Sequence, residues 1–205
     1  IEEYRRIPTS IISDAMAKMF AMDSAIRPFH PRPNVAGHAV TLHSPPGDNL
    51  VLQKAIEMAG PGDILVYNAG GDTTQAPVGE IVVENCIRRG IEGLVIDGPV
   101  RDSDVLPSKA IPVFAKGVTN RGCYKDGPGE IGVTIACGGV VVRPGDLIVG
   151  DSDGVVVVPY EEAENLLPRL KKMLKKEETL LEQIRNKTVD RSWVDQELRD
   201  KGYIF

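Results

Sequence analysis

Two short aliphatic runs with a helical pattern between them constrain the fold most strongly. Residues 64–67 and 93–97 read Ile-Leu-Val-Tyr and Gly-Leu-Val-Ile-Asp, and both have the composition of buried strands. Residues 79–89 between them predict a helix with Ile81, Val82, Asn85 and Cys86 on its inner face. A strand, a helix and a second buried strand in this order indicate an α/β protein.

The flanking segments extend this pattern in both directions. The sequence predicts a helix that begins at Thr9 or Ser10, a strand over 35–42, a helix over 50–59 and a short strand over 111–115. Strand signals dominate residues 131–159. The tripeptide Pro-Gly-Asp precedes an aliphatic run at 61–66 and again at 144–149, which we interpret as one turn-plus-strand arrangement used twice. Together these elements predict an α/β sandwich.

The last part of the chain has a different character. Residues 160–186 are highly charged, with leucines and other apolar residues at helical spacing, and predict a helical arm. Pro168 interrupts this pattern, so we expect a short helix followed by a longer one that starts near the proline. The apolar stripe of the arm packs either on its own domain or on a neighbouring subunit.

Composition narrows the class of function. A chain of 205 residues and 22.2 kDa fits one domain, with a core over about 8–160 and an arm over about 160–205. The net charge of −5 argues against nucleic acid as the main ligand. The three cysteines form no Cys-x-x-Cys motif, so we expect a reducing compartment, the cytoplasm. No apolar run reaches the length of a membrane span, so no membrane partner is expected.

Two segments combine the residue types of an anion and metal site. Gly79-Glu80-Ile81-Val82 opens a predicted helix, whose first amides and positive dipole end suit a small carboxylate. Arg101 and Asp102 follow the strand over 93–97, and the Arg101 guanidinium matches a carboxylate in two bonds. The Glu80 and Asp102 carboxylates are hard oxygen donors that suit Mg²⁺. Loops at the carboxyl ends of such strands are where ligands bind.

Each of these residues also has a purely structural interpretation. Asp102 is a good N-cap for residues 103–106, and a glutamate such as Glu80 is favourable in any first helical turn. Arg101 can pair with Asp104 at the surface. A third segment, residues 120–127, is either a solvated turn or a further wall of the site.

The order of these motifs resembles the RraA-like family. The resemblance is carried by Gly47-Asp48-Asn49, Pro61-Gly62-Asp63, Gly70-Gly71-Asp72, Gly79-Glu80, the run from Gly93 to Asp102, and two glycine-rich motifs at 138–146 and 150–155. It covers about residues 8–160. The family includes metal-dependent 4-hydroxy-4-methyl-2-oxoglutarate aldolases and a regulator of ribonuclease E activity.

The resemblance implies a β/β/α sandwich of the swivelling-domain type and a homo-oligomer, a trimeric ring or a hexamer. It implies that Asp102 binds Mg²⁺ or Mn²⁺ with support from Glu80 through water. It also implies that Arg101 and the amides of residues 79–82 hold the pyruvyl part of a 2-oxo acid. The better-known aldolases usually carry Asp where this chain has Glu80. They also use a glutamate from a neighbour's arm, for which Glu177 and Glu178 are the candidates.

The activity implied by this resemblance is a carbon–carbon lyase reaction. A 2-oxo acid such as 4-hydroxy-4-methyl-2-oxoglutarate would be cleaved to pyruvate by retro-aldol chemistry, and oxaloacetate would be decarboxylated through the same pyruvate enolate. The two loops offer no candidate lysine for a Schiff base, which favours metal chemistry over covalent catalysis. The alternative is a non-catalytic regulator that binds a ribonuclease.

Overall fold

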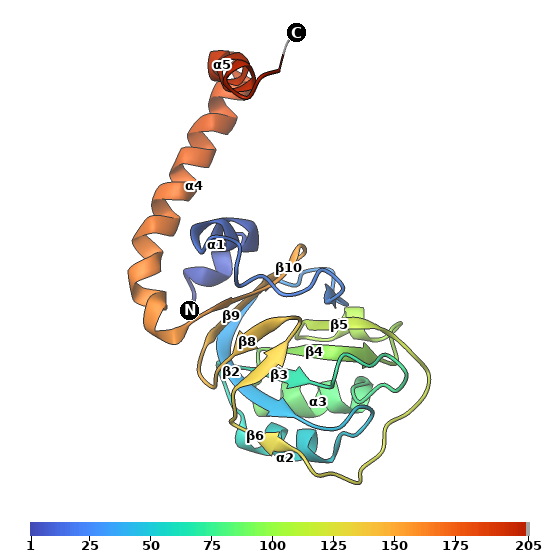
Figure 1. Ribbon diagram of the computed structural model, residues 1–205. Helices are drawn as coiled ribbons and strands as arrows, with labels where there is room; N and C mark the ends of the chain where they lie inside the picture. The colour runs from blue at the N-terminus through green and yellow to red at the C-terminus, as the bar shows by residue number, and fades with distance from the viewer. Residues whose placement is uncertain (204–205) are drawn as a thin grey trace.

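The computed structural model describes residues 1–203, and their centre is a mixed sheet of eight strands (Figure 1). Four neighbouring strands are parallel. They are β2 (Val35–His43), β3 (Asp63–Asn68), β4 (Gly93–Val100) and β5 (Val113–Val118). The antiparallel strands are β1 (Arg27–Pro28), β6 (Glu130–Ile131), β9 (Leu147–Asp151) and β10 (Gly154–Val158). The predicted strands at 35–42, 64–67 and 93–97 are therefore confirmed, although β4 continues through Val100. The strand predicted over 111–115 is present but shifted, because β5 begins at Val113 and ends at Val118.

Both faces of the sheet are covered, and the alternation along β3 shows how. Leu65 and Tyr67 pack under the helices α2 (Leu50–Met58) and α3 (Glu80–Arg89). Ile64 and Val66 face the opposite way, toward the small hairpin of β7 (Ile135–Cys137) and β8 (Val140–Val142). A strand buried on both faces reads as a continuous aliphatic run, which is what residues 64–67 are. The predicted β/β/α sandwich is confirmed.

The two Pro-Gly-Asp turns have the same structure. The Asp63 carboxylate accepts a hydrogen bond from Gly60 N–H at 2.9 Å, and the Asp146 carboxylate accepts one from Arg143 N–H at 2.8 Å. The intervening glycines, Gly62 and Gly145, adopt φ values of 88° and 86°. A left-handed residue here favours glycine, so the repeated tripeptide encodes one turn before β3 and before β9.

A third apolar cluster joins the N-terminal segment and the start of the arm to the sheet. The helix α1 (Thr9–Ala15) and the start of α4 (Ala163–Arg185) pack against β9 and β10, next to the short 3₁₀ turns η1 (Tyr4–Arg6) and η3 (Tyr160–Glu162). The expected N-cap at Thr9 or Ser10 is wrong, because α1 begins after Pro8. The Thr9 hydroxyl and amide instead donate to the Asp151 carboxylate at 2.7 and 2.8 Å.

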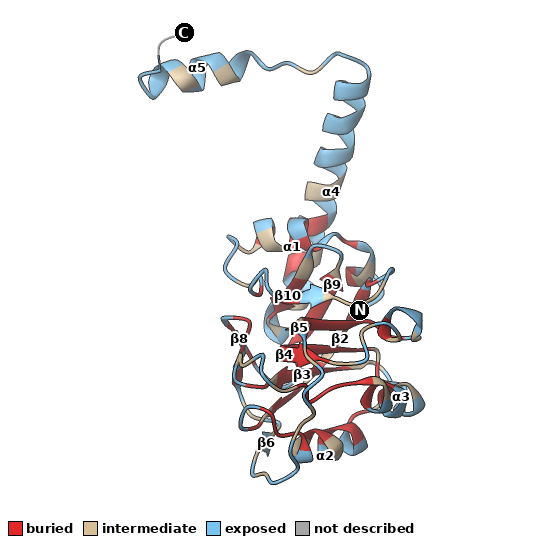
Figure 2. Cartoon of the chain, turned by 90° about the vertical axis from the view of Figure 1, so that its right-hand side faces the viewer, coloured by how far each residue is buried: buried red, intermediate tan, exposed pale blue. Residues whose placement is uncertain are grey.

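The arm projects from the domain as one helix (Figure 2). The expected break at Pro168 is wrong, because α4 continues through it. Leu166 and Leu170 flank the proline and are buried against the domain. Their burial, about 1.5–3 kcal/mol each, offsets the roughly 3 kcal/mol that a proline costs inside a helix. Beyond them α4 leaves the domain and leads to α5 (Ser192–Asp200). No helix within residues 1–203 is long and apolar enough to cross a membrane.

Candidate active site

The two predicted loops meet at the carboxyl edge of the parallel strands. Val78, just before α3, forms a parallel bridge with Val100 at the end of β4, and Arg101 N–H donates to the Val78 carbonyl at 2.9 Å. This contact places the first turn of α3 directly beside the Arg101-Asp102 dipeptide. The convergence predicted from the sequence is present in the structure.

Gly79 is the point of closest approach between the loops. A Cβ atom at Gly79 would lie 2.5 Å from Asp102 Oδ2, 2.8 Å from Arg101 Cγ and 3.0 Å from Arg101 Nε. Asp102 Oδ2 accepts a hydrogen bond from Glu80 N–H at 2.9 Å. Asp102 therefore caps α3 from another loop, and does not use its side chain to cap the residues that follow it. Only a glycine at position 79 leaves room for this arrangement.

Asp102 itself is held in an unfavourable backbone conformation. Its φ is 58°, in the left-handed region that residues with a Cβ rarely adopt. Its carbonyl accepts hydrogen bonds from Val105 N–H and Leu106 N–H at 3.0 and 3.3 Å, which close the turn before η2 (Leu106–Ser108). Strain of this kind, about 1–3 kcal/mol, concentrates at functional sites.

The Arg101 side chain lies between Gly79 and Gly122. A Cβ atom at Gly122 would lie 3.1 Å from Arg101 Nη1, so the segment after β5 is the third wall of the site, one of the two alternatives for residues 120–127. Arg101 Nε is 3.7 Å from Asp102 Oδ2, and the Arg101 side chain is 41% exposed. Its charged partner is therefore Asp102 and not Asp104. Arg101 and Asp102 line an open hollow of about 340 Å³ whose other walls are Ser103, Asp104, Val118, Thr119 and Asn120.

Lys109 is a member of the site that the sequence analysis missed. Its Nζ lies 2.6 Å from Glu80 Oε1 and 2.7 Å from Glu84 Oε1, and its side chain is only 12% exposed. Hydrogen bonds to the two glutamates raise the pKa of Lys109, so its amine is held in the charged form. The i, i+4 spacing of Glu80 and Glu84 places both carboxylates on one face of the helix, where they can share a cation. The neighbouring sequence does not indicate which lysine or arginine pairs with them.

The remaining residues of the first turn of α3 divide between core and surface. Val82 is buried as predicted, whereas Ile81 is 71% exposed and Asn85 is also exposed, which corrects the predicted inner face. The amides of Glu80 and Val82 already donate to Asp102 and to the Gly79 carbonyl. Within residues 1–203 no protein group accepts a hydrogen bond from Ile81 N–H, which leaves this amide for a ligand.

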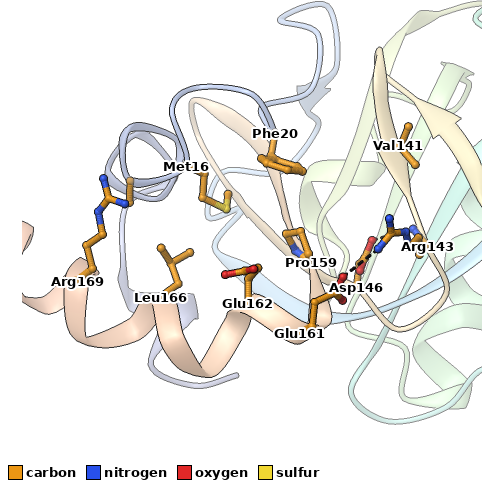
Figure 3. A pocket seen from close by; sticks show the side chains of 11 residues that line it. Met16, Phe20, Val141, Arg143, Asp146, Pro159, Glu161, Glu162, Leu166 and Arg169 are labelled. Atoms are coloured by element: carbon orange, nitrogen blue, oxygen red, sulfur yellow. Dashed lines mark hydrogen bonds and ion pairs between the residues drawn. The ribbon is translucent and has the colours of Figure 1, made fainter.

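The larger cavities of the structure contain none of the predicted site residues. One of about 460 Å³ lies between α1, β8 and the start of α4 (Figure 3). Its floor includes Met16 and Phe20, and Arg143 on its rim is paired with Glu161 at 2.9 Å. Asp146 in its wall accepts from two backbone amides. The hollow at Arg101 is smaller, but a guanidinium and an accessible carboxylate both line it, and the first turn of α3 lies next to Asp102. A guanidinium in such a position can bind a small anion.

A comparison of the sequence with protein-family models identifies the class. The model described as "RraA-like: Aldolase/RraA" matches residues 9–157, and the chain belongs to the RraA-like family. A protein of Halalkalibacterium halodurans, provisionally named 4-hydroxy-4-methyl-2-oxoglutarate aldolase, is 44% identical over 172 residues, which cover 84% of this chain and 82% of that protein.

Solved structures agree with this assignment. The RNA-processing inhibitor RraA from Thermus thermophilus is 30% identical with a TM-score of 0.68, covering 74% of this chain and 92% of that one. An uncharacterized protein from Pseudomonas syringae pv. tomato is 26% identical with a TM-score of 0.79, covering 90% and 87% of the two chains. The family therefore contains proteins named for an aldolase activity and for inhibition of RNA processing.

Proposed function

We propose that this protein is a divalent-metal-dependent lyase that releases pyruvate from 4-hydroxy-4-methyl-2-oxoglutarate or a similar 2-oxo acid. The observation that supports it is the shared hollow of Arg101 and Asp102 beside the first turn of α3. The 44% identity to a protein named as such an aldolase supports the same reading.

In this proposal Arg101 and the Ile81 amide bind the substrate carboxylate. The guanidinium offers two parallel N–H donors, and each charge-assisted bond contributes about 1.5–3 kcal/mol. The Arg101 side chain lies against Gly79 and Gly122, whose missing side chains leave room for the guanidinium at the site. The substrate is thereby oriented with its oxo group toward Asp102.

Asp102 is the residue that would hold the metal. Its Oδ2 is used by Glu80 N–H, no protein group within residues 1–203 hydrogen-bonds Oδ1, and the side chain is 39% exposed. No cluster of three or more His, Cys, Asp or Glu side chains in the described residues could bind an ion. One carboxylate fits Mg²⁺ or Mn²⁺ nonetheless, because such ions commonly combine one or two carboxylates with waters and substrate oxygens. When bound, the ion supplies Lewis-acid stabilisation of developing negative charge.

Glu80 takes a supporting place in this scheme. Its carboxylate is held by Lys109 at 2.6 Å, so a role toward the ion would be through water, while its amide fixes Asp102. Hydrogen bonds to the two glutamates raise the pKa of Lys109, which disfavours the neutral amine that a Schiff base requires. This supports the metal-dependent class of lyase in the proposal.

The same site serves two reactions that differ only in the leaving fragment. In the retro-aldol reaction the bond between C3 and C4 breaks, the C4 hydroxyl loses its proton, and the bonding electron pair stays on the pyruvyl fragment. In oxaloacetate decarboxylation the bond between C3 and C4 also breaks, C4 leaves as CO₂, and the bonding electron pair again stays on the pyruvyl fragment. Protonation of C3 then yields pyruvate in both cases.

The arm supports an oligomeric form of this site. Leu180, Leu181 and Ile184 continue the apolar stripe of α4 past the domain and are 44%, 42% and 52% exposed. Such a stripe is stabilised when a neighbouring subunit covers it. We propose a trimer or hexamer in which Glu177 or Glu178 of the arm reaches the site of a neighbour.

The direct test is an assay of pyruvate release from 4-hydroxy-4-methyl-2-oxoglutarate and from oxaloacetate. Activity should disappear on treatment with a chelator and return with Mg²⁺ or Mn²⁺. Activity untouched by chelation would remove the metal from this account.

Arg101→Ala is the matching variant, because it deletes the carboxylate anchor and leaves Asp102 in place. We expect loss of most turnover in a folded protein. Arg143→Ala, which removes an exposed, ion-paired arginine of the other cavity, is the control and should retain wild-type rates. A folded Arg101→Ala protein with wild-type activity would contradict the assigned role.

The second candidate function is regulation of a ribonuclease. It is favoured by the 30% identity to a protein described as an RNA-processing inhibitor. Tight binding to a ribonuclease in a pull-down, with no lyase activity on any 2-oxo acid, would establish this function instead.

A further inference from the structure

Asn49 places an unsatisfied buried acceptor next to the proposed carboxylate anchor. The residue is 4% exposed, and its Oδ1 has no hydrogen-bond partner among residues 1–203. Buried acceptors are nearly always paired, because leaving one unpaired is unfavourable. An exception beside an active site points to a partner that arrives with a ligand.

The orientation of the Asn49 amide follows from its other contact. Nδ2 donates to the Pro77 carbonyl at 2.8 Å, and because a carbonyl can only accept, Nδ2 and not Oδ1 must face Pro77. Oδ1 therefore points away from that bond. The side chain is held at its base as well, since Asn49 N–H donates to the Tyr124 carbonyl at 3.0 Å.

The Asn49 side chain does not cap the helix α2, although its position is the usual one for a capping side chain. It is the N-cap residue of α2, yet its side chain makes no capping bond. Asp48 takes over this role, because its Oδ1 accepts from Leu50 N–H at 2.8 Å. Asparagine is favoured at an N-cap for its capping oxygen, so a non-capping Asn49 has its oxygen free for another purpose.

A small cavity connects Asn49 with the site. Its volume is about 30 Å³, and its walls include Asn49, Gly79, Val82, Arg101 and Cys123. That is room for about one water-sized group. Because Arg101 lines both this cavity and the larger hollow, a ligand anchored on Arg101 lies beside the cavity.

We propose that Asn49 Oδ1 accepts a hydrogen bond from the hydroxyl group of the substrate and so selects hydroxylated 2-oxo acids. The inference rests on the proposed lyase function and deepens it. A carboxylate or keto oxygen has no proton to donate, whereas a hydroxyl has one and fits the cavity. A site that hydrogen-bonds a substrate hydroxyl discriminates strongly against analogues without it.

The test compares two substrates in one variant. The retro-aldol substrate carries a hydroxyl and oxaloacetate does not, so Asn49→Ala should lower the ratio of their kcat/KM values by about tenfold or more. Asn85→Ala is the matched control, because Asn85 Nδ2 also donates to a backbone carbonyl, at 3.0 Å, but on the exposed face of α3. In Asn85→Ala the ratio of the two kcat/KM values should equal that of the wild type.

A second measurement uses only the wild-type protein. 4-Methyl-2-oxoglutarate, which lacks the hydroxyl, should inhibit with a dissociation constant at least about tenfold weaker than the KM-derived affinity of the hydroxylated substrate. Equal affinities, or equal losses of both reactions in Asn49→Ala, would overturn the role of Asn49 and assign the cavity to a structural water. Absence of both reactions in the wild type would instead reject the lyase function itself.

Discussion

Replacement of Gly79 by alanine perturbs the site through a single methyl group. Gly79 has φ of −150° and ψ of −168°, extended values that alanine adopts without strain. The new Cβ would lie 2.5 Å from Asp102 Oδ2 and 2.8 Å from Arg101 Cγ. The cost therefore falls on the two side chains and not on the backbone at Gly79.

The size of the effect follows from these distances. Ordinary van der Waals contact begins at 3.4 Å, so the Asp102 carboxylate has to move by about 0.9 Å. The charge-assisted bond from Glu80 N–H would then be weakened or lost, at about 1.5–3 kcal/mol. A misplacement of about 1 Å in a catalytic group costs roughly 100-fold in rate, or about 2.7 kcal/mol. We expect a loss of about 100-fold in kcat/KM for pyruvate release.

The assay measures kcat/KM by coupled detection of pyruvate, together with the melting temperature of each variant. Gly60→Ala is the matched control, because nothing lies within 4 Å of a Cβ atom at that position. It should keep wild-type activity. A Gly79→Ala protein that works within threefold of the wild type would refute the reasoning, because the contact between the two loops would then be irrelevant to the reaction.

Three further perturbations test other parts of the structure. Lys109→Met should lower the urea midpoint and reduce activity, because Glu80 loses its partner, and high salt should shrink the stability difference from the wild type. Burial acts to raise the pKa of Asp48, but three backbone amides outweigh it and hold the pKa below its usual value. The stability contributed by this ionised carboxylate is present above about pH 4 and is lost as pH falls through the lowered pKa, so in urea unfolding at several pH values the wild-type advantage over Asp48→Asn should narrow below about pH 4. Truncation after residue 174 should leave the fold intact but reduce the oligomer size measured by light scattering.

The fold was largely predictable because its central strands are buried on both faces. The aliphatic run at residues 64–67 is enough to identify such a strand. The helix over 79–89 and the strand over 93–97 can likewise be identified from their local sequence patterns. The end of the arm and its proline were not predictable in the same way. Whether Pro168 breaks α4 depends on how Leu166 and Leu170 pack against the domain, which is a tertiary effect.

The candidate site was predictable only where the order of strands and helices brings its residues together. Arg101 and Asp102 follow a strand and Gly79 precedes a helix, so topology alone brings them to one edge. Lys109 and Asn49 reach the site from elsewhere, and their roles depend on side-chain directions that a sequence does not record. Ile81 shows the same limit, because the helical pattern does not reveal how the first turn of α3 is rotated.

The most direct test of the central claim is an anomalous difference map from crystals soaked with Mn²⁺ and oxalate, a stable analogue of the pyruvate enolate. We predict a manganese peak in direct coordination contact with Asp102 Oδ1, with an oxalate carboxylate on the Arg101 guanidinium. A manganese peak at another place, or oxalate bound without contact to Arg101, would contradict the proposed site.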